Sequence, residues 1–118
     1  MKISKMQELL DARVLCCEEN TDKHVYSACG CDLMSDVLAY VKDQSVLLTG
    51  LVNPQVIRTA VMMDMVCIVF VRSKTPNDEM IALAKEHGIV MMRTNKTLYT
   101  TCGLLYSNGL VGTAEVAR

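Results

Sequence analysis

The residues Ser45-Val-Leu-Leu-Thr-Gly50 open the stretch that decides the fold. Two more apolar runs follow the first, Met65–Val71 and Ile89–Met92. Apolar runs without alternation are typical of strands in a sheet that is covered on both faces. Helical segments separate the runs at Pro54–Met63 and Pro76–His87, and each begins with a proline, which suits the first position of a helix. Strands joined through helices by short loops lie parallel, so this stretch predicts the centre of an α/β domain.

Further elements are predicted on the N-terminal side of this stretch. A helix is expected over residues 4–11, where Ser4 and Gln7 form a capping-box pattern. Strands are expected at Ala12–Cys17 and His24–Ala28. Together with the three central runs they predict a single layered α/β domain, with a mostly parallel sheet of roughly five strands flanked by helices.

Two more helices complete the prediction. Cys29–Asp32 is expected to be a tight turn, and Asp32 is the predicted N-cap of the helix that follows it. The predicted buried face of that helix is Leu33, Met34, Val37, Leu38 and Val41. A last helix is expected after Thr97, and Asn108-Gly109 ends it.

Length and composition argue against several classes of function. The chain has 118 residues, so we expect one domain over 1–118, with its core at 12–106 and a C-terminal tail at 107–118. The net charge is −1 and aromatic residues make up 4%, which argues against nucleic-acid binding. No apolar run reaches the length of about 20 residues that a membrane-spanning helix needs, and the N-terminus does not resemble a signal peptide. We therefore expect a cytoplasmic protein that binds neither nucleic acid nor membrane.

Candidate ligand-binding residues lie in the turns that follow the predicted strands. In open α/β sheets, ligands bind beyond the carboxyl ends of the strands, where helix N-termini offer free amides to an anion. Four turns are predicted at this edge, at 29–32, 49–53, 72–75 and 93–97. Their candidate ligand-binding residues are Thr49, Asn53, Arg72, Ser73, Lys74, Thr75 and Arg93. These residues favour a phosphorylated small molecule, but the same residue types are also ordinary helix caps and solvated surface residues.

The six cysteines are the other candidates for chemistry. Cys29 and Cys31 are weak candidates for a metal site, because they stand one residue closer together than a Cys-x-x-Cys chelate. Cys31 also precedes a predicted helix, which lowers the pKa of a thiol. Cys67 and Cys102 fall in apolar patterns and are expected in the core. We find no phosphate-loop motif, paired carboxylates or nucleophile–base pattern, so we expect neither enzyme activity nor a cofactor.

The segment Gly30-Cys-Asp-Leu-Met-Ser-Asp-Val-Leu38 and the order of the elements resemble the DRTGG domain family over residues 12–106. This resemblance implies an α/β domain similar to the N-terminal domain of HPr kinase/phosphorylase, with a regulatory or ligand-sensing role and no catalysis of its own. Stand-alone members are similar to proteins encoded beside iron hydrogenase components, which implies a link to anaerobic redox or carbohydrate metabolism. The Asp-Arg-Thr-Gly-Gly signature is absent, and Thr49–Asn53 and Arg72–Pro76 stand in the corresponding turns. Glycines would let a ligand approach the backbone amides closely, and the side chains in these turns restrict that approach.

Three functions follow from these observations. The first is a non-enzymatic regulatory or protein-interaction domain that forms a homodimer, with an adaptable apolar surface at Met62, Met63, Met91 and Met92. The second is a sensor of a small anion or nucleotide that uses the candidate residues of the turns. The third is a metal or redox-thiol protein built on Cys29 and Cys31.

Overall fold

The computed structural model describes residues 1–41 and 44–112. The strands in these residues are β1 (Arg13–Cys16), β2 (Ser27–Gly30), β3 (Ser45–Thr49), β4 (Cys67–Phe70) and β5 (Val90–Arg93). The helices are α1 (Ile3–Leu10), α2 (Met34–Tyr40), α3 (Pro54–Met62), α4 (Asp78–Glu86) and α5 (Leu98–Ser107), with a short 3-10 helix, η1 (Glu18–Asn20). Among the described residues, none of the helices combines the length and apolar character that a membrane crossing requires.

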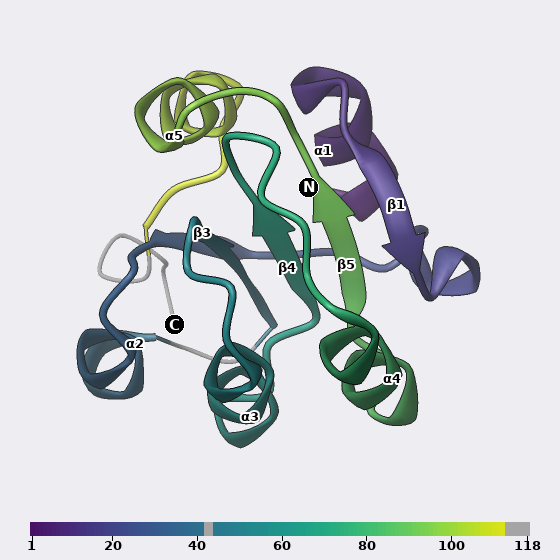
Figure 1. Ribbon diagram of the computed structural model, residues 1–118. Coiled ribbons are helices and arrows are strands. Elements are labelled where there is room, and N and C mark those ends of the chain that lie inside the picture. Colours follow the sequence, from purple (N-terminus) through teal and green to yellow (C-terminus); the bar gives the residue numbers. More distant parts are fainter. Residues whose placement is uncertain (42–43, 113–118) are drawn as a thin grey trace.

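The strands form one mixed sheet in the order β1-β5-β4-β3-β2. Strands β2 to β5 pair in parallel with their neighbours, and β1 runs antiparallel beside β5. Helices α2, α3 and α4 cover one face of the sheet, while α1 and α5 lie together on the other (Figure 1). The predicted fold, an α/β domain with a mostly parallel five-stranded sheet flanked by helices, is therefore confirmed.

The central strands are buried on both faces, which explains their unbroken apolar sequences. Every residue of β3 and of β4 is buried, and Phe70 is among the largest side chains that solvent does not reach. Met91 and Met92 on β5 are also fully buried. The expectation that these two methionines form an apolar surface is wrong, because β5 lies inside the sheet between β1 and β4. Met62 on α3 is exposed.

The two proline-led helices begin differently. Helix α3 starts at Pro54 as predicted, and the side chain of Asn53 caps it by accepting a hydrogen bond from a first-turn amide. Pro76 does not open α4, which starts at Asp78 after the cap residue Asn77. The Asn77 side chain accepts a hydrogen bond from a first-turn amide at 2.9 Å, and this satisfied amide decides where the helix begins.

Helix α1 begins earlier than its capping-box pattern predicts. Its N-cap is Lys2, and no side chain makes a capping hydrogen bond. The amides of Ile3 and Ser4 instead donate to the carbonyl oxygens of Lys23 and Thr21, at 3.0 and 2.8 Å. A distant loop therefore satisfies the free amides of the first turn, which local sequence cannot reveal.

Strand β2 lies later in the chain than predicted. It covers residues 27–30 rather than 24–28, so Cys29 and Gly30 belong to a strand and not to a turn. Asp32 is not the N-cap of α2, since Leu33 holds that position without a side-chain hydrogen bond. The predicted apolar face of α2 is only partly buried: Met34, Val37 and Val41 are buried, and Leu33 and Leu38 are exposed.

Helix α5 packs on the end of β2 and leads into a segment that lies against the sheet. A Cβ atom added to Gly30 would stand 2.6 Å from the Sγ atom of Cys102, so only glycine permits this close approach. After α5, Leu110 is buried, and the amide of Ala28 donates to the carbonyl oxygen of Val111 at 3.0 Å. Residues 107–112 of the expected tail therefore belong to α5 and to the edge of β2, whereas residues 113–118 lie outside the described residues.

Candidate functional site

The four turns that were predicted to hold a ligand meet at one edge of the sheet. Strands β2 to β5 are parallel and in register, from Gly30 beside Leu48 to Phe70 beside Arg93, so their carboxyl ends align. The chain leaves each of these strands at the same edge. The segments after β2, β3, β4 and β5 therefore lie side by side, as the parallel topology requires.

Asp32 joins the first two of these turns. Its Oδ1 atom accepts a hydrogen bond from the Thr49 hydroxyl at 2.8 Å and another from the Gly50 amide at 2.9 Å. The Gly50 and Thr49 hydrogen bonds, together with the nearby Arg72 guanidinium, hold the pKa of the Asp32 carboxyl below its usual value. Asp32 is therefore a carboxylate at neutral pH, and it positions the turn after β3.

A tight turn after β4 positions Arg72. Arg72 and Ser73 both have positive φ angles, of 54° and 58°, and the Lys74 amide donates to the Val71 carbonyl oxygen at 3.1 Å. These are the features of a type I′ turn, which normally uses asparagine and glycine at its two central positions. An arginine and a serine there cost conformational energy, because the side chain of an L-residue crowds the backbone in this region.

The turn after β4 is tied to the turn after β5. The Arg72 amide donates to the Lys96 carbonyl oxygen at 2.8 Å, and the Ser73 amide donates to the Thr94 carbonyl oxygen at 2.9 Å. The Ser73 hydroxyl also donates to the side-chain oxygen of Asn95. This network holds the strained turn in place and brings the two predicted segments together.

The guanidinium groups of two arginines face this edge. A Cβ atom added to Gly50 would stand 3.0 Å from an Nη atom of Arg72, so Arg72 extends back over the turn after β3. Arg93 donates from Nη1 to the Thr75 hydroxyl at 3.0 Å. Among the described residues, the Arg72 guanidinium has no hydrogen bond or ion pair. Its donors are available to an anion.

The structure therefore brings together most of the predicted residues but changes two roles. Asn53 lies in the same edge, but its side-chain oxygen caps α3 through the Gln55 amide at 2.8 Å. Asp32, predicted as a helix cap, is instead part of the site. The sequence signal for Asp32 was its place in the turn after β2, and only the pairing of β2 with β3 shows that Thr49 and Gly50 lie beside it.

The cysteines show a different environment. Burial, with nearby Cys31 and Cys102, raises the pKa of the Cys29 thiol to about 11. A thiol with a raised pKa is a weak nucleophile at neutral pH. Cys67 is fully buried, as predicted, and Cys102 is partly buried. Within residues 1–41 and 44–112, no three histidine, cysteine or acidic side chains gather as metal ligands would.

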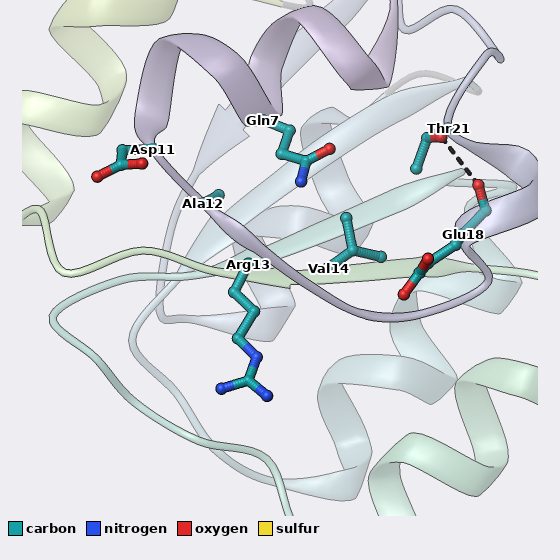
Figure 2. A pocket seen from close by; sticks show the side chains of 7 residues that line it. All are labelled: Gln7, Asp11, Ala12, Arg13, Val14, Glu18 and Thr21. Atoms are coloured by element: carbon teal, nitrogen blue, oxygen red, sulfur yellow. Dashed lines mark hydrogen bonds between the residues drawn. The ribbon is translucent and has the colours of Figure 1, made fainter.

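Two of the concave surfaces on the described part of the chain lie outside the four turns. One, of about 620 Å³, runs beside β1 between α1 and η1, and Gln7, Arg13, Val14 and Glu18 are among its lining residues (Figure 2). The other, of about 600 Å³, is shallow and apolar and lies over the outer side of α5. Neither involves the predicted ligand-binding residues.

Comparison with known proteins identifies the family. The family model of the DRTGG domain matches residues 5–107. Among curated proteins, none matches the sequence. A similar solved structure is the crystal structure of the CBS and DRTGG domains from the regulatory region of Clostridium perfringens pyrophosphatase, complexed with the activator diadenosine tetraphosphate. It shares 15% sequence identity at a TM-score of 0.72, and the match covers 99% of this chain but 50% of that one. The chain therefore belongs to the DRTGG domain family.

Proposed function

We propose that this chain is a non-enzymatic regulatory domain that senses a small anionic ligand, with a phosphorylated metabolite or nucleotide as the ligand class. The binding site is the carboxyl edge of the sheet, where Arg72, Lys74 and Arg93 supply the cations. The observation that carries the proposal is the turn after β4. A strained type I′ turn holds the Arg72 guanidinium over Gly50 without an ion-pair partner among the described residues.

Backbone strain in a folded protein persists only where surrounding contacts impose it, and it concentrates at binding and switch sites. Here two hydrogen bonds from the turn amides to the segment after β5 impose it. An asparagine and a glycine in the same turn would remove the strain but also the cation. A cation at this strained position supports a binding role, in addition to its electrostatic effect on the nearby Asp32 carboxylate.

The similar pyrophosphatase region supports the same class of function. That protein is a regulatory region bound to a nucleotide activator, diadenosine tetraphosphate. For this chain, a nucleotide with several phosphate groups is accordingly the first ligand to test. We propose no turnover of the ligand, since binding that shifts an equilibrium between states is sufficient for regulation.

A second function, association with another protein chain, has its own supporting observation. Helix α5 carries no charged residue over its ten positions, yet Tyr99 is 89% exposed and Tyr106 is 57% exposed. Large apolar side chains that are exposed together on one face of a helix often mark a protein–protein contact. We propose that a second copy of the chain covers the outer face of α5, so that the regulatory domain acts as a homodimer.

A thermal-shift titration tests the sensing function. The full chain is titrated with pyrophosphate, ADP, ATP and diadenosine tetraphosphate at constant ionic strength. A ligand at about 100 times its dissociation constant stabilises the protein by roughly 2.7 kcal/mol, which raises the melting temperature by about 10 °C in a domain of this size. Phosphate release is followed in parallel and is expected to be absent.

Matched variants locate the binding site. Arg72→Gln is expected to weaken binding at least tenfold, because a charge-assisted hydrogen bond to phosphate is lost. Arg58→Gln, at an exposed position on α3, makes the same change of charge and is expected to leave binding unchanged. Binding of no anion by the wild-type chain, or equal losses in the two variants, would contradict the proposal.

A further inference from the structure

Two arginines lie directly opposite each other in the antiparallel part of the sheet. Arg13 on β1 pairs with Arg93 on β5, and the next pair along is Val14 with Met92. Side chains of directly opposed residues project from the same face of a sheet, with their Cβ atoms about 5 Å apart. Like charges in this arrangement destabilise the pairing of the strands. The presence of two arginines at these opposed positions therefore requires an explanation.

The opposed pair lies on the face that carries α4. The side chain of Arg13 projects from β1 in the direction opposite to Gln7 of α1 (Figure 2), and α4 packs against both β1 and β5. Arg93 reaches the Thr75 hydroxyl, which belongs to the loop that leads into α4. Arg13 is exposed and Arg93 is partly buried, so the two cationic groups face solvent beside the proposed binding site.

Nearby carboxylates do not neutralise the pair. Asp11 and Glu18 line the concave surface beside β1, which Arg13 also lines, and Asp78 and Glu79 occupy the first turn of α4. Among the described residues, neither Arg13 nor Arg93 forms an ion pair with any of them. The Arg93–Thr75 hydrogen bond involves a neutral hydroxyl. Within residues 1–41 and 44–112, no carboxylate forms an ion pair with either arginine.

We propose that Arg13 and Arg93 together bind one phosphate group of the anionic ligand, with the Thr75 hydroxyl beside them. This rests on the proposed sensing function and extends it. It adds Arg13, on the antiparallel edge strand, to the residues of the site, and it specifies a ligand group with at least two negative charges. A dianionic phosphate converts the repulsion between the strands into an attraction shared by both guanidinium groups, each of which is suited to bidentate contact with phosphate oxygens.

The proposal predicts that removal of one arginine has opposite effects on ligand binding and on the stability of the ligand-free protein. Removal of one arginine weakens binding of the phosphate, but it relieves repulsion in the protein without ligand. A residue with a merely structural role would destabilise the free protein when it is removed. Added salt screens the repulsion, so the stabilising effect is largest at low ionic strength.

The test compares Arg13→Gln with wild type, Arg72→Gln and the control Arg58→Gln, with pyrophosphate as the probe. Arg13→Gln is expected to bind pyrophosphate on the order of tenfold more weakly at constant ionic strength. Without ligand it is expected to melt at a higher temperature than wild type in low salt, and the difference is expected to vanish at about 1 M salt. Arg58→Gln is expected to change neither the affinity nor the salt dependence.

The outcomes distinguish this inference from the function on which it rests. If Arg72→Gln weakens binding but Arg13→Gln does not, the inference is overturned and the sensing function stands. If the wild-type chain binds neither pyrophosphate nor any of the nucleotides, the sensing function fails and the inference fails with it. A lower melting temperature of ligand-free Arg13→Gln in low salt also overturns the inference, because the pair then stabilises the sheet by itself.

Discussion

Gly30 shows how a single missing side chain decides the distance between a helix and the sheet. An added Cβ atom would stand 2.6 Å from Sγ of Cys102, a distance that forces atoms to move. Gly30→Ala is therefore expected to destabilise the fold by about 1–3 kcal/mol, measured by urea denaturation. The double variant Gly30→Ala/Cys102→Ala is expected to recover much of this loss, because it removes the opposing sulfur.

Gly103 provides the matched control on the same helix. A Cβ atom there meets no atom within 4 Å. Gly103→Ala is expected to stabilise the fold by up to about 1 kcal/mol, since alanine favours a helix more than glycine does. If both glycine variants lose stability equally, close packing of α5 on β2 is not the reason for Gly30.

Asp32 makes a pH-dependent contribution to stability. Its pKa is lowered in the folded protein by the Gly50 amide, the Thr49 hydroxyl and Arg72. A lowered folded-state pKa means that the contribution is fully present above the unfolded-state pKa of about 3.9 and disappears as the pH falls through the folded-state value. Because the carboxylate is exposed and solvent screens it, the contribution is modest, about 1 kcal/mol.

Asp32→Asn is the variant that checks this contribution. It is expected to be less stable than wild type at pH 7 in urea denaturation, and the two proteins are expected to become equal near the acid end of the titration. A difference that stays constant from pH 7 to a pH below the folded-state pKa of Asp32 would show that the charge of Asp32 is not what stabilises the turn.

At the scale of elements, the turn after β4 holds a cationic residue, Arg72, at a position where it lowers the stability of the fold. Replacing Arg72 and Ser73 with asparagine and glycine fits both central positions of the type I′ turn. This double variant is expected to gain roughly 1 kcal/mol of stability, because relief of two strained residues outweighs the loss of the Ser73–Asn95 hydrogen bond and of the attraction between Arg72 and Asp32. Its anion binding is expected to fall, measured by the same thermal-shift titration. Unchanged binding would separate the turn from the sensing function.

The elements differ in how far local sequence predicts them. The apolar run at Ser45–Thr49 coincides with β3. The run Met65–Val71 is longer than β4, Cys67–Phe70, because Met65 and Val71 are buried without belonging to the strand. The start of α4 was not predicted, since Pro76 and Asn77 are adjacent and both are residues found at helix starts. The start of α1 depends on carbonyl oxygens of residues about 20 positions away, so its own sequence suggested the wrong cap.

At the scale of the whole molecule, the outer face of α5 predicts self-association. Tyr99 and Tyr106 stand two helical turns apart on this face. Tyr99→Lys is expected to shift the chain from dimer to monomer in sedimentation velocity, because it places a charge in an apolar contact. Met62→Lys is the matched control, as it changes an equally prominent apolar side chain, 69% exposed, on the opposite layer of helices. A monomeric wild-type chain at high concentration would contradict the proposed homodimer.

The location of the candidate site could be predicted from the sequence, but the contacts within it could not. The segments after the four parallel strands meet at one edge as predicted, because parallel strands bring their carboxyl ends together, although Cys29 and Gly30 belong to β2 and not to a turn. The contacts within it were not predicted. Arg72 over Gly50 and Arg13 opposite Arg93 join residues that are far apart in the chain, and they depend on the register of the sheet.

The sequence by itself determined the class of this fold, the burial of its central strands and which segments meet at the carboxyl edge of the sheet. Those properties depend on the spacing of apolar residues and on the proline, asparagine and glycine residues that begin or end the elements. Both are features of the local sequence. Only the tertiary structure decided the neighbours of Asp32, Arg72 and Arg13. These neighbours depend on strand register and on a turn imposed by distant hydrogen bonds, and no local pattern encodes which side chains a folded sheet places together.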